Sequence, residues 1–89
     1  MSNGHRIAQI RERLEQAFSP KSLDITDDSH QHIGHPGAKD GRGHFSVRIV
    51  STRFSGHSPI ERHRMVYEAL GNLMLTDIHA LRITALERE

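Results

Sequence analysis

The chain has 89 residues, enough for one small hydrophobic core, so we expect a single domain over residues 1–89. It contains no cysteine, which excludes disulfide frameworks, thiol nucleophiles and any iron-sulfur or zinc site built from its own thiolates. Lysine and arginine number 12 against 11 acidic residues, so the net charge of +1 provides no overall field that would attract nucleic acid.

A helix and a short strand are predicted first. Apolar residues recur at three- and four-residue steps from Ile7 to Phe18, as is typical of an amphipathic helix, and Pro20 ends the pattern. From Ser22 to Asp27 apolar and polar residues alternate, which predicts a half-buried strand.

Residues 29–43 are the least regular segment. Four glycines and one proline interrupt them, and neither a helical nor a strand period is sustained, so we expect a long loop. Loops of this length are usually functional or mobile. Three of the eight histidines, His30, His32 and His35, lie here, and their spacing permits metal chelation without requiring it. The alternative is that a glycine-rich loop tolerates any polar residue.

The second half predicts a strand, two helices and a last strand. Alternation over residues 44–51 predicts a strand paired antiparallel with the first. Residues 58–61 have the pattern of a helix capping box, and a break at 71–72 leaves a short second helix near residues 73–76. Alternation returns over residues 78–86. The expected order of elements is therefore α-β-β-α-α-β.

One face of the longer predicted helix carries five residues at helical spacing: Ile60, His63, Tyr67, Leu70 and Met74. We interpret this face as buried, which makes His63 a structural residue. Arg62 and Arg64 flank it. Together with Arg53 these arginines are candidate phosphate contacts, although arginines on a helix usually form only a solvated face.

His79 begins the last predicted strand. It has the same alternation phase as Leu81 and Ile83, so its side chain is expected to point toward the apolar face. Its position at the strand's end keeps it within reach of solvent or a partner. The alternative is a core histidine.

Several classes of function lack their motifs. There is no nucleophile elbow, phosphate loop, zinc-protease helix motif or dinucleotide fingerprint. Residues 34–37 match the G-x-x-G pattern of KH domains, but they lie between two strands rather than two helices, so we interpret the match as accidental. No apolar run approaches the roughly 20 residues that cross a bilayer, and residues 1–10 do not resemble a signal peptide. We expect a cytoplasmic protein that is not an enzyme and has no membrane partner.

Five short motifs occur in order: Asp27-Asp28-Ser29-His30, His44-Phe45, Phe54-x-Gly56-x-Ser58, Arg62-His63-Arg64 and Ile78-His79-Ala80-Leu81. Together, over residues 22–86, they resemble the BolA family, as a BolA-like protein of the bacterial type. The resemblance implies one BolA-like domain with a class II KH-like α/β (α+β) fold. Such a fold has a three-stranded mixed sheet packed on helices and a helix-turn-helix-like segment.

The resemblance also implies a partner and a cofactor. BolA proteins form heterodimers with monothiol glutaredoxins that bridge a [2Fe-2S] cluster and act in iron or redox homeostasis or cluster trafficking. Thiolates would come from the glutaredoxin and its glutathione, imidazoles from this side, and no cluster would be bound by the isolated chain. Carried over by position, His79 is one ligand and His32 the other, with His30 and His35 as alternatives. His44 also matches a family histidine, and its outward phase leaves its role open.

An alternative function follows from the same resemblance. Bacterial members are described as DNA-binding transcriptional regulators of stress response and morphology, and their reader would correspond to residues 54–75. Arg53, Arg62 and Arg64 would make the phosphate contacts. A net charge near zero and the lack of an aromatic platform argue for weak or conditional binding.

Overall fold

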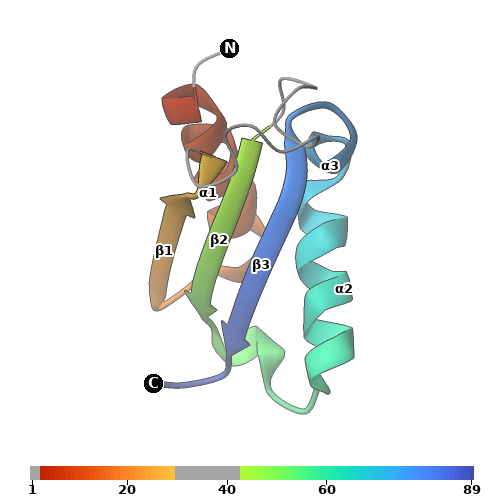
Figure 1. The fold of residues 1–89 in the computed structure, drawn as a ribbon. Helices are drawn as coiled ribbons and strands as arrows, with labels where there is room; N and C mark the ends of the chain where they lie inside the picture. Colours follow the sequence, from red (N-terminus) through yellow and green to blue (C-terminus); the bar gives the residue numbers. More distant parts are fainter. Residues whose placement is uncertain (1–2, 30–42) are drawn as a thin grey trace.

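A three-stranded mixed sheet and two longer helices make up the part of the chain that the computed structural model describes, residues 3–29 and 43–89 (Figure 1). Its elements, in chain order, are α1 (Asn3–Phe18), β1 (Ser22–Asp27), β2 (Gly43–Val50), the 3₁₀ helix η3 (Thr52–Phe54), α2 (Pro59–Leu70), α3 (Leu73–Thr76) and β3 (Ile78–Leu86). The predicted order is confirmed, with η3 as an addition. Most of the predicted loop, with His30, His32 and His35, lies outside the described residues.

The sheet has the strand order β1-β2-β3. β1 pairs antiparallel with β2, as predicted, and Leu23 lies opposite Ile49. β2 pairs parallel with β3, with Val47 opposite Ile83. A parallel pair requires a crossover connection, which η3, α2 and α3 provide. The α+β class with a mixed three-stranded sheet is therefore confirmed.

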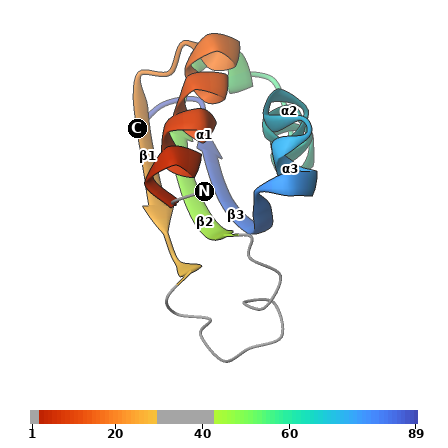
Figure 2. The same ribbon diagram turned by 90° about the horizontal axis from the view of Figure 1, so that it is seen from above.

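The core lies between one face of the sheet and the two longer helices. In Figure 1 α1 lies behind the sheet and α2 runs beside β3, and Figure 2 gives the same arrangement from above. The central buried residues come from every layer: Ile10, Leu14 and Phe18 of α1, Phe45, Val47 and Ile49 of β2, Phe54 of η3, and Val66 and Leu70 of α2. Because side chains alternate along a strand, the opposite face of the sheet carries exposed residues such as Asp24, Arg48 and Arg82. None of the helices described is both long and apolar enough to span a lipid bilayer.

α2 begins as the sequence predicts. The Ser58 hydroxyl accepts a hydrogen bond from the Glu61 amide at 3.2 Å, and the Glu61 carboxylate accepts one from the Ser58 amide at 2.7 Å. The hydrogen bond from the Ser58 backbone lowers the pKa of Glu61. This reciprocal capping box fixes the first turn of the helix.

The orientation of α2 differs from the prediction. Ile60 is 67% exposed and Tyr67 is 40% exposed, and His63 is exposed as well. Leu70, on the predicted face, is buried as expected, and Val66, which lies outside that face, is buried as well. The helix carries apolar residues on two sides, and the side that contains Val66 packs on the core. The prediction of a structural, buried His63 is therefore wrong.

An ion pair between Arg6 and Asp77 connects the first turns of α1 to the residue that precedes β3. Arg6 Nε lies 3.2 Å from Asp77 Oδ2, and the two side chains are only 11% and 6% exposed. The hydrogen bond from the Thr76 hydroxyl, with a smaller contribution from Arg6, holds the pKa of Asp77 below its usual value, although burial acts in the opposite direction. Asp77 is therefore a carboxylate in the folded protein at neutral pH.

The pH dependence of the free energy of unfolding tests the contribution of this ion pair. Because the pKa of Asp77 is lowered in the folded state, its carboxylate stabilises the fold at neutral pH, and this stabilisation is lost as the pH falls below about 4 and through the folded-state pKa. We expect Asp77→Asn to lower the free energy of unfolding by about 2 kcal/mol at pH 7 and by less at pH 3. Urea unfolding at both pH values measures the difference. An equal loss at the two pH values would mean that the charge plays no part.

Candidate functional site

The end of β1 and the beginnings of β2 and β3 meet at one end of the sheet, because β1 is antiparallel and β3 parallel to β2. Two histidines that are 35 positions apart in the sequence come together there. The ring centroids of His44 and His79 lie 4.9 Å apart, with an angle of 48° between the ring planes. The residues described near this end of the sheet therefore include a pair of adjacent imidazoles.

A bulge in β3 sets the position of His79. Gly43 lies opposite Ile78 and His44 lies opposite Ala80, so β3 contains one extra residue, His79, at this point. Ile78 is buried, whereas His79 and Ala80 are both exposed. The predicted shared phase of His79 with Leu81 is therefore wrong, because His79 is itself the extra residue of the bulge and the regular alternation begins at Ala80. Its accessibility at the strand's end is confirmed, as expected where a bulge re-aims a side chain.

His44 is held from the β1 side of the sheet. Its backbone N–H donates to the Ser29 hydroxyl at 3.0 Å, and its carbonyl oxygen accepts from the Asp28 amide at 2.7 Å. Ser29 in turn donates its backbone N–H to Asp27 Oδ1 at 2.8 Å. His44 has the predicted outward phase, yet it is only 6% exposed. Its contact with His79 depends on the pairing of β2 with β3, which no local sequence signal reports.

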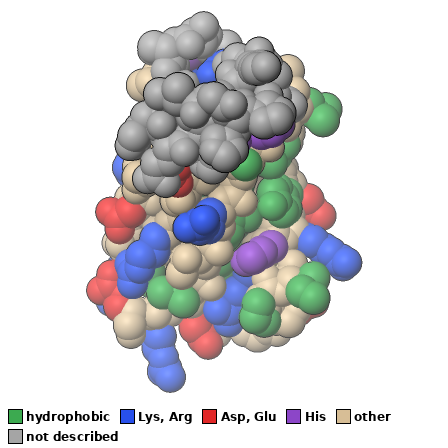
Figure 3. Space-filling view, in the orientation of Figure 1, with side chains coloured by type: hydrophobic (Ala, Val, Ile, Leu, Met, Phe, Trp, Pro, Cys, Tyr) green, Lys and Arg blue, Asp and Glu red, His purple; other side chains and the backbone are tan. Residues whose placement is uncertain are grey.

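A pocket of about 200 Å³ lies beside the histidine pair. Its lining combines three apolar residues with one carboxylate, one imidazole and one guanidinium: Asp28, His44, Phe45, Ala80, Leu81 and Arg82. Asp28 also accepts a hydrogen bond from the Ser46 hydroxyl. Figure 3 shows the open face of the sheet, over which charged side chains of both signs lie.

Two imidazoles at this end of the sheet are candidate metal donors. Across residues 3–29 and 43–89, no three His, Asp or Glu side chains converge on a point where a metal ion would fit. His44 and His79 form a pair, and imidazole nitrogen suits borderline metals such as iron and zinc. The predicted ligand His32 and its alternatives, His30 and His35, fall on the segment that the structure does not describe.

The three arginines predicted to contact nucleic acid have different surroundings. Arg53 Nη1 donates to the carbonyl oxygen of Ala17 at 2.8 Å, at the end of α1. Arg64 is exposed on α2. Arg53 therefore has a structural contact, while Arg64 faces solvent.

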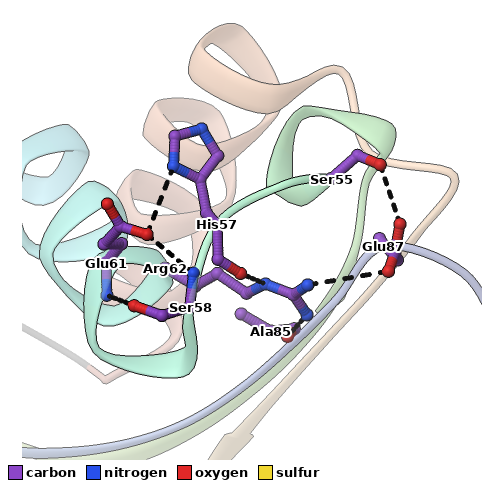
Figure 4. Close-up of polar contacts among 7 residues, drawn as sticks. All are labelled: Ser55, His57, Ser58, Glu61, Arg62, Ala85 and Glu87. Atoms are coloured by element: carbon purple, nitrogen blue, oxygen red, sulfur yellow. Dashed lines mark hydrogen bonds and ion pairs between the residues drawn. The ribbon is translucent and has the colours of Figure 1, made fainter.

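Arg62 joins three segments at the end of the sheet opposite His44 and His79 (Figure 4). Its Nε donates to the His57 carbonyl oxygen at 2.9 Å, and its Nη1 donates to the Ala85 carbonyl oxygen at 3.1 Å. Its Nη2 lies 3.8 Å from Glu87 Oε1, and Ser55 holds the other oxygen of Glu87 at 2.8 Å. Arg62 thus ties the start of α2 to the end of β3, and its contact with nucleic acid stays a prediction.

The sequence is similar to one protein family and to several of its known members. Residues 14–89 match the family described as BolA-like protein. The chain is 41% identical over 87 residues to SufE-like protein 1, chloroplastic/mitochondrial, of Arabidopsis thaliana, covering 92% of this chain and 24% of that protein. It is 45% identical over 78 residues to BolA-like protein 1 of Mus musculus, covering 88% of this chain and 55% of the relative. The chain thus spans about a quarter to about half the length of these curated relatives.

Solved structures agree with these matches. The BolA domain of SufE1 from Arabidopsis thaliana has a TM-score of 0.80 at 41% identity, covering 91% of this chain and 90% of that one. The solution structure of BolA1 from Mus musculus has a TM-score of 0.73 at 44% identity, covering 89% of this chain and 62% of that one. The predicted resemblance is confirmed over most of the sequence, and the chain belongs to the BolA family.

Proposed function

We propose that this chain is a non-enzymatic adaptor that docks a monothiol glutaredoxin and shares a bridging [2Fe-2S] cluster with it, in iron or redox homeostasis or in cluster trafficking. The observation that carries the proposal is the exposed His79, which a bulge brings to 4.9 Å from His44 in a chain without cysteine. Family membership supports the same conclusion. The chain would act in the cytoplasm.

The donor set fits a shared cluster. A [2Fe-2S] cluster is held by four ligands, and in some centres two imidazoles replace two thiolates and raise the reduction potential. This chain offers imidazoles and no thiolate, so the thiolates would come from the glutaredoxin and its glutathione. When bound, the cluster would supply one-electron redox chemistry. His79 would be one ligand from this side and His32 the second, with His30 and His35 as the alternatives.

His44 would have a positioning role. Its backbone is fixed by the hydrogen bonds with Ser29 and Asp28, and its ring lies against the ring of His79. A neighbour that is itself held in place limits the rotamers open to an exposed side chain. His44 would therefore keep the His79 ring pre-oriented toward a partner, and less rotational freedom would be lost on binding.

Co-elution tests the proposal. The chain is mixed with a glutathione-loaded monothiol glutaredoxin, iron and sulfide under anaerobic conditions and passed over a size-exclusion column. We expect one peak that contains both proteins and absorbs in the visible range. Two separate peaks, with no visible absorption in any fraction that contains this chain, would overturn the proposal.

DNA binding through residues 54–75 is the alternative function. The observation that favours it is the exposed Arg64 on α2, which can reach a phosphate without breaking any contact that holds the fold. A fluorescence titration at several salt concentrations measures the number of phosphate contacts. If DNA binding is real, Arg64→Ala should reduce the slope of log affinity against log salt by about 0.9, the effect of one contact. An unchanged slope would remove Arg64 from the interface.

A further inference from the structure

Asp77, two residues before His79, is fixed by contacts of both its side chain and its backbone. Asp77 is only 4% exposed, and both oxygens of its carboxylate are engaged. Oδ2 lies 3.2 Å from Arg6 Nε, and Oδ1 accepts a hydrogen bond from the Thr76 hydroxyl. Arg6 and Asp77 are 71 positions apart, so this contact ties the first turns of α1 to the entrance of β3.

The backbone of Asp77 is fixed as well. Its N–H donates to the Leu73 carbonyl oxygen at 2.9 Å, which ends α3, and its own carbonyl oxygen accepts from the Gly43 amide at 3.0 Å, which starts β2. At Gly43 a Cβ atom would overlap the Phe45 ring, so a larger residue at the start of β2 would displace that ring. Asp77 is therefore the point at which α1, α3, β2 and β3 are joined.

The bulge begins immediately after this junction. Ile78 lies opposite Gly43, and the extra residue His79 follows before His44 pairs with Ala80. A shift of one residue turns a strand's side chains to the opposite face. The register at Asp77 and Gly43 thus decides whether His79 lies beside His44 or is turned away from it.

A buried ion pair is weak evidence for stability, because its desolvation cost offsets much of its attraction, and its best-attested use is to specify register. We propose that the Arg6–Asp77 ion pair is a positioning device that sets the register of β3 and thereby holds the imidazole of His79 against that of His44. The inference rests on the proposed function for the role of the two histidines, but not for their geometry. It can therefore be tested on the free chain.

The test uses the NOE between ring protons of His44 and His79 in the isolated protein, since ring centroids 4.9 Å apart place those protons within range. We expect Arg6→Gln and Asp77→Asn each to abolish this NOE while the remaining amide spectrum stays dispersed. Arg6→Lys keeps the positive charge and should retain the NOE. Two variants from opposite sides of the pair keep the test decisive if one of them fails to fold.

Arg62→Gln is the matched control. It removes a part-buried arginine that also joins distant segments, but at the opposite end of the sheet (Figure 4). We expect it to lower stability and to leave the NOE unchanged. The proposal would be overturned if the NOE survives in both Arg6→Gln and Asp77→Asn, or if Arg62→Gln abolishes it too. Failure of the glutaredoxin experiment with these NOE results intact would count against the proposed function alone.

Discussion

In the His79→Ala variant, the complex with the glutaredoxin is expected to lose its cluster at least about tenfold more readily than the unmodified chain. Changing groups that only support a metal ligand already costs about 10- to 100-fold in affinity, so loss of a ligand itself should cost no less. Visible absorption of the reconstituted complex during anaerobic dialysis against a chelator measures the effect. His79 is exposed, so its replacement should leave the fold intact.

His63→Ala provides the matched control for His79→Ala. His63 is also an exposed histidine, but it lies on α2 and does not belong to the pair at the end of the sheet. Its replacement removes the same side chain and should leave the rate of cluster loss unchanged. Equal behaviour of the two variants would remove His79 from the site.

The largest expected change in stability comes from Phe54→Ala. Phe54 is fully buried in η3, and its ring centroid lies 4.8 Å from that of Phe18 in α1. Truncating a buried phenylalanine to alanine costs about 3 to 5 kcal/mol, a large part of the roughly 5 to 15 kcal/mol by which domains are stable. We expect a loss in this range in urea unfolding monitored by circular dichroism.

Ile60→Ala is the control for Phe54→Ala. Ile60 is 67% exposed at the start of α2, so its truncation should change the free energy of unfolding by no more than about 0.5 kcal/mol. A cost close to that of Phe54→Ala would mean that the Ile60 side of α2 faces the core, in the orientation that the sequence pattern predicts. The comparison thus tests the rotation of α2 as well as the packing of η3.

Elements with local signals were predictable from the sequence. β1 follows from alternation over six residues, the start of α2 from its serine, proline and glutamate, and its end from Gly71, whose φ of 55° few other residues adopt. Each of these signals involves residues within a few positions of one another, so one stretch of sequence contains the whole cause of the structure.

The histidine pair was only half predictable. The family motif identifies His79 and notes His44, but their contact depends on a bulge in a parallel pair whose strands are separated in the sequence by η3, α2 and α3. Strand periodicity assumes regular alternation, so it placed His79 in phase with Leu81. A bulge is visible only when both strands of the pair are known.

The structural use of Arg62 and the orientation of α2 also have non-local causes. An arginine beside His63 and Arg64 suggests a basic patch, whereas the acceptors of Arg62 include a carbonyl oxygen 23 residues away, at Ala85. Likewise, a helix with apolar residues on two sides does not reveal which side the sheet covers. In both cases tertiary packing decides between alternatives that the sequence leaves equal.

Isotope labelling shows whether this chain supplies imidazole nitrogen to a cluster that it shares with a second molecule. The chain is prepared with ¹⁵N, combined with an unlabelled glutaredoxin and glutathione, and the reduced complex is examined by pulsed electron paramagnetic resonance. We predict strong hyperfine coupling to ¹⁵N, which disappears when the label is on the glutaredoxin instead. A cluster that shows no directly coordinated ¹⁵N from this chain would rule out the proposed imidazole ligands.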